Sequence, residues 1–289
     1  MYDYKKAFER NLGWVTPEEQ EKIKTTRIAV IGMGGVGGHH AHCLARMGFS
    51  QFKISDFDTF EIQNFNRQFG ALSSTVGKKK TDVIKNTILD INPEASVECF
   101  DEGINESNME EFLRGVDVIC DGLDLYASHL RSPLYELAHK MGVYIVSAGP
   151  FGMGTSCIVI NPKGMSFNEY FDLNHPNLTV EAKIIRFLAG MAPTMMHRKY
   201  IADPERVQLF EGTLPSIQPG CYAASAALGT VVLKLALGRG KVLFAPTTYH
   251  TDLYLNKAKK SWLPFGNRNP LQKIKIKILH RMFKVKVFK

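Results

Sequence analysis

The sequence predicts an α/β fold, a Rossmann-like, doubly wound and mostly parallel sheet that is flanked by helices. Short apolar segments alternate with amphipathic segments over the first 150 residues of the 289-residue chain. The first apolar segment, 27–31, runs directly into a glycine-rich turn. Such alternation is typical of right-handed β-α-β units, in which a helix connects two parallel strands. With 45% apolar residues, the chain can bury a core large enough for such a sheet.

Start and stop signals place the elements of this half. Thr16-Pro17-Glu18-Glu19 begins a helix, because it joins a threonine N-cap and a first-turn proline to a capping-box glutamate. Asn92-Pro93 ends another helix, since the residue before a proline disfavours helical geometry. The expected strands are 27–31, 52–55, 97–100, 116–120 and 143–148, and the expected helices between them are 35–47, 77–91, 107–114 and 127–141.

The pattern loosens after residue 150, and the C-terminal half is expected to be rich in loops. A turn-rich bend at 149–154 leads into this half. Its expected elements are a strand at 156–160, helix-like pieces around 180–191 and 204–210, a buried helix at 220–237 and a strand at 247–253.

The net charge of +8 is concentrated at the C-terminus. Residues 257–289 hold eleven Lys or Arg and no acid, which leaves 25 basic and 28 acidic residues in 1–256. The body is therefore mildly acidic, and the charge does not indicate a nucleic-acid-binding surface over the whole protein. We divide the chain into a core domain, 1–256, and a basic C-terminal tail, 257–289.

The tail alternates apolar and basic residues in two runs, 274–278 and 283–287. Period two favours strands, such as a hairpin or an edge strand paired with a partner. The tail could also contact an anionic membrane or an acidic protein partner, because cationic and apolar side chains act together at a lipid surface. An RNA contact and a solvated, partly ordered terminal segment are the remaining alternatives.

The sequence has no run of about 18 uncharged apolar residues, so no segment is expected to span a bilayer. The longest apolar stretch, 222–237, is interrupted by Lys234 and is expected to be a buried helix. The N-terminus, Met1-Tyr-Asp-Tyr-Lys-Lys, lacks the pattern of a signal peptide. These features predict a cytoplasmic protein, with the basic tail as its candidate peripheral contact with a membrane.

Cysteines and histidines do not form a recognisable metal site. The cysteines are five, an odd number, and none belongs to a Cys-x-x-Cys pair, so neither a disulfide framework nor a structural zinc ion is expected. His39, His40 and His42 have no cysteine or carboxylate at ligand spacing, and we expect them to pack in the fold or lie on its surface. The cysteines are Cys43, Cys99, Cys120, Cys157 and Cys221.

The glycine turn predicts a nucleotide site. Gly32, Gly34 and Gly37 permit a tight turn, a close approach of phosphate to the backbone and close packing of the following helix. Backbone amides at the start of that helix then attract an anion. Asp56, at the end of the second strand, is where a ribose-binding acid belongs. The turn alone does not decide between nucleotides.

Polar residues after the turn favour chemistry on a polyphosphate. Arg67 supplies a rigid fork for phosphate oxygens and Lys80 a compact charge, with Asn64 and Gln68 as neutral hydrogen-bonding groups. These residue types suit the transfer of AMP from ATP to a carboxylate, which needs charge stabilisation at the phosphates, in-line positioning and a magnesium ion.

Asp121 and Asp124 follow a strand end and are the candidate magnesium ligands. Two other classes of protein explain the pattern less completely. A nicotinamide-dependent oxidoreductase would use the glycine turn and Asp56 but would leave Arg67, Lys80 and Asp124 without a role. A non-catalytic scaffold would be expected to have lost these phosphate-handling residues, which are intact here.

Five motifs, in this order and at this spacing, resemble the ThiF/MoeB/HesA superfamily, the bacterial relatives of the ubiquitin-activating enzymes. The resemblance runs through about 10–160 and recurs near 220–238. The paired Cys-x-x-Cys motifs of many members are absent, so the chain resembles a stand-alone ThiF-like protein without zinc. The motifs are Gly32-x-Gly-Gly-x-Gly37, Asp56-Phe-Asp58, Asn64-x-Asn-Arg67-Gln68, Val76-Gly77-x-x-Lys80 and Asp121-x-x-Asp124.

The resemblance implies a site for ATP and Mg²⁺. It implies that Asp56 holds the ribose hydroxyls and that Asp124 binds magnesium. It also implies that Gln68 supports Arg67. Contacts to the nucleotide are expected from Gly32, Gly34, Gly35, Gly37, Asp58, Asn64, Arg67, Lys80 and Asp121.

The resemblance further implies an ATP-dependent adenylyltransferase that activates a carboxylate as acyl-AMP and releases pyrophosphate. The carboxylate could be the C-terminus of a ubiquitin-like or sulfur-carrier protein, or of a peptide, and residues 161–219 would cover it. Members are usually homodimers in which an N-terminal arginine, here Arg10, reaches the neighbour's ATP. A tRNA-modification dehydratase acting on a carboxylate-bearing adenosine is the alternative within this class. Cys221, at a helix start that favours thiolates, is either a nucleophile for sulfur or acyl transfer or a core residue.

Overall fold

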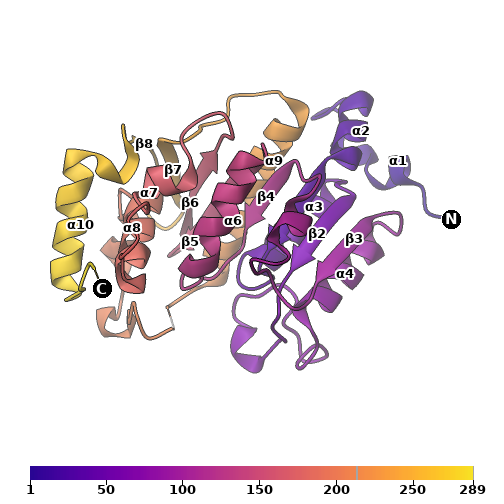
Figure 1. The fold of residues 1–289 in the computed structure, drawn as a ribbon. Helices are drawn as coiled ribbons and strands as arrows, with labels where there is room; N and C mark the ends of the chain where they lie inside the picture. The colour runs from indigo at the N-terminus through magenta and orange to yellow at the C-terminus, as the bar shows by residue number, and fades with distance from the viewer. Residues whose placement is uncertain (213, 289) are drawn as a thin grey trace. The chain divides into compact units, whose positions relative to one another are not determined.

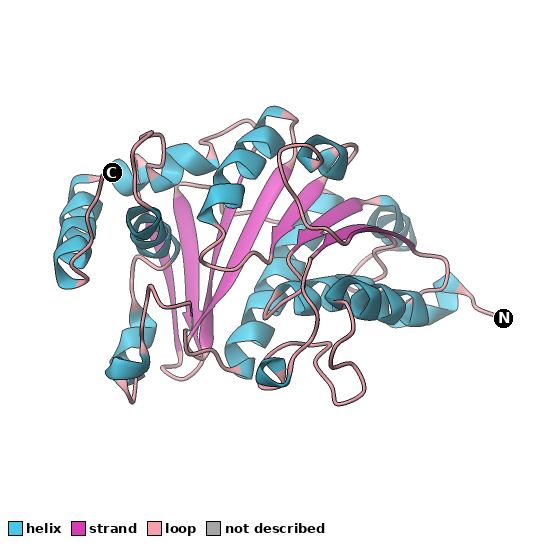
Figure 2. Cartoon of the chain, turned by 60° about the horizontal axis from the view of Figure 1, so that its bottom comes forward, coloured by secondary structure: helices cyan, strands magenta, loops and turns pink. Residues whose placement is uncertain are grey.

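The computed structural model describes residues 1–212 and 214–288, and the chain forms two compact units. The first unit comprises Met1–Leu123 and Ser225–Val242, and the second comprises the remaining described residues. Helices flank the strands of each unit (Figures 1 and 2). The predicted α/β class is confirmed.

The first unit contains four parallel strands in the order β3-β2-β1-β4. Ile31, at the end of β1, pairs with Ser55 of β2 and with Asp121 of β4. The carboxyl ends of these strands therefore share one edge, which is where parallel sheets bind their ligands. The four strands are β1 (Arg27–Ile31), β2 (Gln51–Ser55), β3 (Ser96–Phe100) and β4 (Val118–Asp121).

The helices of the first unit follow the predicted order. α2 (Pro17–Thr25) begins with the predicted capping box, in which Thr16 and Glu19 each accept the other's backbone amide. α3 (Gly37–Arg46) starts at the glycine turn. The remaining helices that lie wholly in this unit are α1 (Tyr4–Ala7), η1 (Glu9–Asn11), η2 (Ile62–Asn64), α4 (Lys80–Ile91) and α5 (Met109–Leu113).

The predicted helix at 220–237 is α9 (Gln218–Leu237), which begins in the second unit and ends in the first. Its length and apolar composition would allow it to cross a membrane, and 39% of its most apolar window is buried. Core helices of globular proteins meet the same criterion, so α9 is weak evidence for a membrane span.

The second unit contains four antiparallel strands in the order β5-β6-β7-β8. The hairpin of β5 and β6 closes at Phe151 and Gly154, which pair with each other. Gly152 lies in the turn with a φ of +61°, in the left-handed region that glycine tolerates best. The bend predicted at 149–154 is therefore confined to two residues. The strands are β5 (Tyr144–Phe151), β6 (Gly154–Ile160), β7 (Thr247–Asp252) and β8 (Lys257–Trp262).

β8 was not predicted, because its sequence is basic and lacks a clear apolar face. It pairs with β7 in register from Asp252 and Lys257 to Thr247 and Trp262. β8 is the edge strand of this unit's sheet, and exposed lysines on an edge strand discourage pairing with another chain.

The prediction of a strand at 274–278 is wrong, because this part of the tail lies in the helix α10 (Pro270–Met282). The Asn269 side chain caps the helix by accepting a hydrogen bond from the Leu271 amide. An alternation of isoleucine and lysine is compatible with a helix if not all of the isoleucines must face the core. Here only Ile276 is buried among the three isoleucines of the run. The burial of one helix face therefore decides the structure.

The second predicted run of the tail, 283–287, forms no strand. This segment is held by the start of α8, where the Thr179 amide donates to the Val287 carbonyl at 3.1 Å. An isolated bridge joins Leu178 to Phe288.

α8 (Val180–Met191) and α10 lie side by side (Figure 1) and share an apolar core. The fully buried members of this core are Ile184, Ile185, Ala189, Leu209, Ile276 and Leu279. The helix predicted at 180–191 is confirmed, whereas only the first residues of the predicted 204–210 are helical. The other helices are α6 (Ser128–Lys140), α7 (Phe167–Phe171), η3 (Met196–Tyr200), η4 (Pro204–Arg206) and η5 (Gly266–Arg268).

Candidate functional site

Two glycines of the turn are required by close backbone packing. Gly32 has a φ of +81°, and a Cβ on it would lie 2.4 Å from the Gly122 carbonyl oxygen. A Cβ on Gly37 would lie 1.6 Å from the Gly32 carbonyl oxygen. The ends of β1 and β4 and the start of α3 therefore meet without side chains. Gly122 belongs to this set, although the sequence analysis singled out only the two aspartates of its motif.

The other two glycines of the turn lie in less crowded surroundings. A Cβ on Gly34 would meet the Gln68 side chain at 3.8 Å, and one on Gly35 would meet the Arg67 side chain at 3.8 Å. These are ordinary contact distances, so this stretch of backbone faces Arg67 and Gln68 directly. The predicted phosphate-binding backbone and the predicted phosphate-binding arginine are thus neighbours in the first unit.

Asp56 holds the glycine turn in place. Its Oδ2 accepts a hydrogen bond from the Met33 amide at 2.6 Å, and its Oδ1 accepts one from the Asp58 amide at 2.8 Å. Burial raises the pKa of the Asp56 carboxyl, and the nearby charge of Lys80 opposes that rise. The acid predicted to bind ribose therefore also positions the turn.

Arg67 lies on a short loop that begins with Asn64. The Asn64 carbonyl accepts hydrogen bonds from the amides of Arg67 and Gln68, at 3.2 and 2.9 Å. Arg67 Nη1 donates to the Gln63 carbonyl at 3.0 Å and to Asn66 Oδ1 at 2.9 Å. The Asn64 side chain is buried and accepts from the Glu61 amide, which fixes the start of the loop.

His39 joins this loop to α3, a role that the sequence analysis missed. Its Nε2 lies 3.1 Å from the Arg67 carbonyl oxygen, and its ring packs edge-on against Phe69. The Ser225 hydroxyl donates to the His39 carbonyl at 2.8 Å. His42 stacks on Phe69 with ring centroids 4.1 Å apart, so the packing role expected of these histidines is confirmed. The one sequence signal for this contact is the position of His39 in the first turn of the helix that follows the glycines.

The Gln68 side chain lies beside the glycine turn, where its Nε2 would be 3.8 Å from a Cβ on Gly34. The side chain is 8% exposed, and its Oε1 has no hydrogen-bond partner among the described residues. A buried amide oxygen without a partner costs free energy in the absence of a donor. The buried Oε1 is closed to solvent, so a ligand would reach it only after a local rearrangement.

Lys80 begins α4 and lies against Asp58. Its Nζ is 2.9 Å from Asp58 Oδ2, and its backbone amide donates to the Asp58 carbonyl at 3.0 Å. Lys80 is buried, whereas Lys78 is exposed and Lys79 forms an exposed ion pair with Asp101. Lys78 and Lys79 are therefore solvated, whereas Lys80 is enclosed by protein.

The two candidate magnesium ligands fall in different units. Asp121 ends β4 in the first unit, is buried, and accepts from the Leu123 amide at 3.1 Å. Asp124 opens the second unit, is exposed, and accepts from the Tyr126 amide at 3.0 Å. Mg²⁺ usually takes one or two protein carboxylates and keeps several waters, so a single carboxylate of either residue is a suitable ligand by its chemistry.

The described residues contain no group of three or more His, Cys, Asp or Glu side chains able to hold a metal. The five cysteines are free thiols. Burial raises the pKa of Cys157 to about 12 and that of Cys99 to about 11, which disfavours their thiolates.

Arg10 and Cys221 are the two remaining predicted site residues. Arg10 is exposed in the short helix η1 of the first unit. Cys221 belongs to the second unit, in the first turn of α9, and is fully buried, with its Sγ 3.9 Å from the Ser216 hydroxyl. A buried thiol cannot meet a substrate without a local rearrangement.

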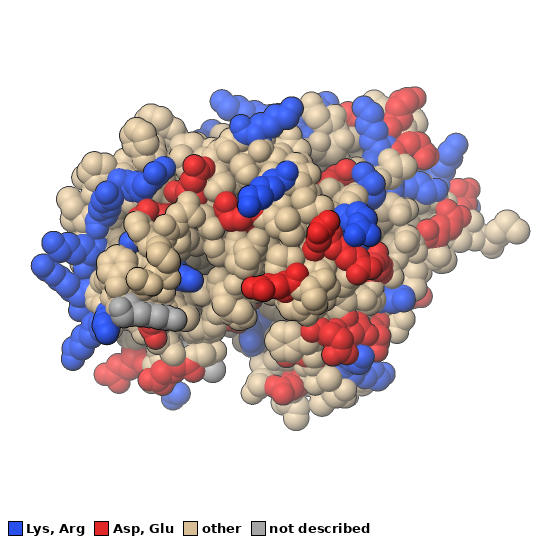
Figure 3. All heavy atoms as spheres, viewed as in Figure 1, with Lys and Arg blue, Asp and Glu red and all other residues tan. Residues whose placement is uncertain are grey.

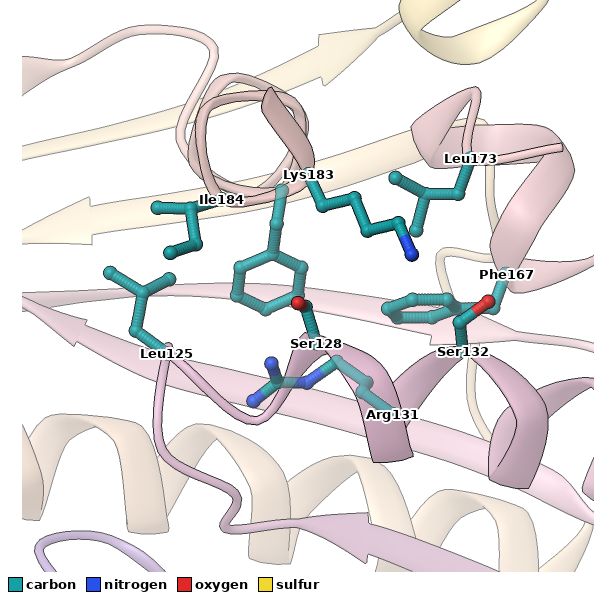
Figure 4. Close-up of a pocket in the computed structure, with 9 residues that line it drawn as sticks. Leu125, Ser128, Arg131, Ser132, Phe167, Leu173, Lys183 and Ile184 are labelled. Carbon is teal, nitrogen blue, oxygen red and sulfur yellow. The ribbon is translucent and has the colours of Figure 1, made fainter. Parts of the chain in front are cut away.

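A small pocket lies in the second unit between α6, α7 and α8 (Figure 4). The Lys183 ammonium points into it, and Arg131 lies against the Phe187 ring with its guanidinium carbon 4.5 Å from the centroid. The volume inside is about 10 Å³, roughly the room that one water molecule needs. The pocket is therefore too small, as it stands, for a nucleotide or for an amino-acid side chain.

The chain matches the ThiF family over residues 8–272. The tRNA threonylcarbamoyladenosine dehydratase of Haemophilus influenzae is 36% identical over 132 residues, which are 45% of this chain and 51% of the relative. The enzyme of the same name from Bacillus subtilis is 40% identical over 126 residues, 43% of this chain and 50% of the relative. The chain spans about half the length of these curated relatives.

Among solved structures, E. coli MccB with ATP has a TM-score of 0.66 at 20% identity and covers 88% of this chain and 70% of MccB. This likeness shows a shared fold. The family match extends over most of the chain and includes the glycine turn, the arginine loop and Lys80. The chain therefore belongs to the ThiF family.

Proposed function

We propose that the protein is an ATP-dependent adenylyltransferase that activates a carboxylate as acyl-AMP. The observation that carries this proposal is the position of Arg67, which lies directly against the open backbone of the glycine turn at Gly35. A guanidinium at that position can bind a phosphate group through two parallel hydrogen bonds. A hydride-transfer enzyme would not need this cation.

Each residue of the site would have a different role in binding ATP. Amides at the start of α3 and the Arg67 guanidinium would bind phosphate oxygens, and Lys80 would add a second cation. Asp56 would hold both the turn and the ribose hydroxyls. Gln68 would support Arg67 from its position beside the turn. When phosphate binds to the Lys80 ammonium, the ion pair between Lys80 and Asp58 would weaken.

The reaction itself is a displacement at the α-phosphorus of ATP. An oxygen of the substrate carboxylate forms a bond to the α-phosphorus, and the bond between that phosphorus and the bridging oxygen breaks. Pyrophosphate leaves with that oxygen. Asp124, with Asp121 nearby in sequence, would hold a magnesium ion, which neutralises phosphate charge when bound. No protein nucleophile is required in this step.

We propose that the carboxylate belongs to a peptide or to a small ubiquitin-like or sulfur-carrier protein, with residues 161–219 covering it. Support for a protein or peptide substrate comes from relatives such as the SAMP-activating enzyme E1 of Haloferax volcanii, 27% identical over 157 residues. We also propose a homodimer in which Arg10 of one copy reaches the ATP of the other. The exposure of Arg10 is compatible with such a contact.

A second candidate function is dehydration of a carboxylate-bearing adenosine in tRNA. It is favoured by the two relatives that are 36% and 40% identical and bear the name of that enzyme. The same ATP site would activate this carboxylate. Incubation with tRNA that carries threonylcarbamoyladenosine, followed by mass spectrometry of the nucleosides, would reveal the loss of one water.

Binding of ATP with magnesium, measured by calorimetry, tests the site without knowledge of the carboxylate. Arg67→Ala should weaken binding by roughly 10- to 100-fold, because a charge-assisted contact to phosphate is lost. Lys78→Ala is the matched control, since Lys78 is exposed on the segment that leads to Lys80. Binding of NADH without binding of ATP would overturn the proposal.

ATP–pyrophosphate exchange across candidate peptides, carrier proteins and modified tRNA then identifies the carboxylate. Exchange that depends on one acceptor and disappears in Arg67→Ala would support adenylylation. ATP binding without exchange for any acceptor would favour a scaffold. For Cys221, Cys221→Ser should leave exchange intact and abolish a later transfer step only if the thiol carries the acyl group or sulfur.

A further inference from the structure

α10 has two differently exposed sides. Its inner side packs on α8 through Gln272, Ile276 and Leu279, which are all buried. The Lys275 ammonium also turns inward and donates to the Pro193 carbonyl at 2.6 Å. The helix is therefore fixed to the second unit, and its outer side is presented as a preformed surface.

The outer side carries an exposed apolar strip. Leu271 is 78% exposed, Ile274 57%, and Ile278 and Met282 54% each. Their spacing of three and four residues places them along one side of the helix. Large aliphatic side chains gathered in this way on an exposed helix mark a surface that is covered in function.

A basic strip runs beside the apolar strip. Lys273, Lys277 and Arg281, each four residues apart, are exposed and form no ion pair within the described part of the chain. The sequence has no acid after Asp252. Lysine and arginine side chains gather over the part of the second unit where α10 lies (Figures 1 and 3).

We propose that the outer side of α10 docks on an anionic lipid surface. The apolar strip would enter the boundary between headgroups and acyl chains, and the basic strip would contact lipid phosphates. This inference goes beyond the proposed reaction, which uses residues of other elements. α10 is already folded against α8, so docking requires no helix formation.

The size of the surface favours lipid over a protein partner. A helix of 13 residues is roughly 20 Å long. With a helix width of about 10 Å, its outer side covers about 200 Å², against the roughly 800 Å² per partner that a stable protein interface buries. A lipid surface needs no matching shape, and it gains from each inserted apolar side chain and each nearby cation.

Co-sedimentation of the full chain with vesicles tests the proposal. Vesicles of phosphatidylglycerol and phosphatidylcholine should pellet the protein, and vesicles of phosphatidylcholine alone should pellet at least about tenfold less, because each cation near the surface favours the anionic lipid. Pelleting should weaken as salt is raised, since screening reduces the attraction.

Two variants test the contributions of the apolar strip and the basic strip to vesicle binding separately. Ile274→Ser with Ile278→Ser, and separately Lys273→Gln with Lys277→Gln and Arg281→Gln, should each reduce partitioning into anionic vesicles by about tenfold or more. The matched control replaces the exposed Lys257, Lys259 and Lys260 of β8 by glutamine. It removes the same number of charges and should retain most of the binding.

Thermal unfolding and ATP binding of each variant report on folding and on the nucleotide site separately. Both should match the wild type, because every substituted side chain is exposed. Three results would overturn the inference. They are unchanged pelleting in both strip variants, an equal loss in the β8 control, or a wild-type dimer that the isoleucine variant dissociates without any vesicle binding. The last result would assign the surface to a second copy of the chain.

Discussion

The Lys80 ammonium lies 2.9 Å from the Asp58 carboxylate, and the two partners differ sharply in exposure. The Lys80 side chain is 7% exposed and that of Asp58 is 52% exposed. Asp58 thus provides the charge partner of a cation that is otherwise enclosed by protein. Removing the acid would leave the buried charge without its ion pair, which costs more than the loss of an exposed pair.

Asp58→Asn should therefore lower the free energy of unfolding by about 1–2 kcal/mol, measured by urea denaturation. Glu94→Gln is the control, because it removes the exposed partner of Lys24 and should cost less than Asp58→Asn. Combining Asp58→Asn with Lys80→Met should recover part of the loss. Equal losses of unfolding free energy in the two single variants would show that the ion pair between Lys80 and Asp58 stabilises the fold no more than an exposed ion pair does.

The glycines of the turn should separate into two groups on substitution. Gly37→Ala should destabilise the fold by at least about 3 kcal/mol, because its Cβ would lie 1.6 Å from a carbonyl oxygen. Gly35→Ala should fold with a cost below about 1 kcal/mol, since its Cβ would make only ordinary contacts. The unfolding free energies of both variants can be compared by urea denaturation.

ATP binding gives the complementary test. Gly35→Ala should weaken ATP binding by about tenfold or more, because the methyl group would stand between the backbone and the phosphates. If Gly35→Ala binds ATP as tightly as the wild type, phosphate does not approach at Gly35. A Gly37→Ala variant that is as stable as the wild type would contradict the packing described for Gly32 and Gly122.

Local signals allowed much of the first unit to be predicted from the sequence. The capping box at Thr16, the glycine turn and Asn92-Pro93 each act within a few residues, and the structure has a helix boundary at each. The parallel direction of these strands follows from the same alternation. Contacts between distant segments were harder to predict, since nothing in the sequence near Gly122 indicates that it must meet Gly32 and Gly37.

The structure of the basic tail could not be predicted from its local sequence. Its alternation of isoleucine and lysine satisfies the pattern of a strand, and helix propensity is too weak to exclude one. α10 forms because α8 offers an apolar partner that buries Ile276 and Leu279, and that partner lies some 90 residues earlier in the chain. β8 was missed for a related reason, because an edge strand needs only one paired side and little apolar sequence.

His39 should act as a positioning residue for Arg67. A carbonyl only accepts hydrogen bonds, so His39 Nε2 must carry the proton that bonds the Arg67 carbonyl. His39→Ala should weaken ATP binding by about threefold to tenfold and increase amide hydrogen exchange over residues 63–69, as the loop loses this tether. His39→Gln can still donate from a side-chain nitrogen and should recover part of both effects.

His42→Ala is the control for this prediction, since His42 stacks on the same Phe69 ring without reaching the Arg67 carbonyl. Equal effects of His39→Ala and His42→Ala on ATP binding would assign the role to packing on Phe69. A loss of thermal stability in His39→Ala without any change in ATP binding would assign His39 a structural role only.

Asp56 should make stability depend on pH in a defined direction. Burial raises the pKa of the Asp56 carboxyl above its ordinary value, with the Lys80 charge opposing the rise. Between the ordinary and the raised pKa, the folded state holds the proton more firmly than the unfolded state does. The stabilisation from this group is therefore complete below the ordinary pKa and is lost as the pH rises through the folded pKa.

Urea denaturation of the wild type and of Asp56→Asn from about pH 3.5 to 7 measures this effect, because the other titrating groups cancel in the difference. The free energy of unfolding of the wild type, relative to Asp56→Asn, should fall as the pH rises and then level off. A relative free energy that rises with pH would mean that the hydrogen bonds from Met33 and Asp58 outweigh burial, and that the folded protein prefers the ionised carboxylate.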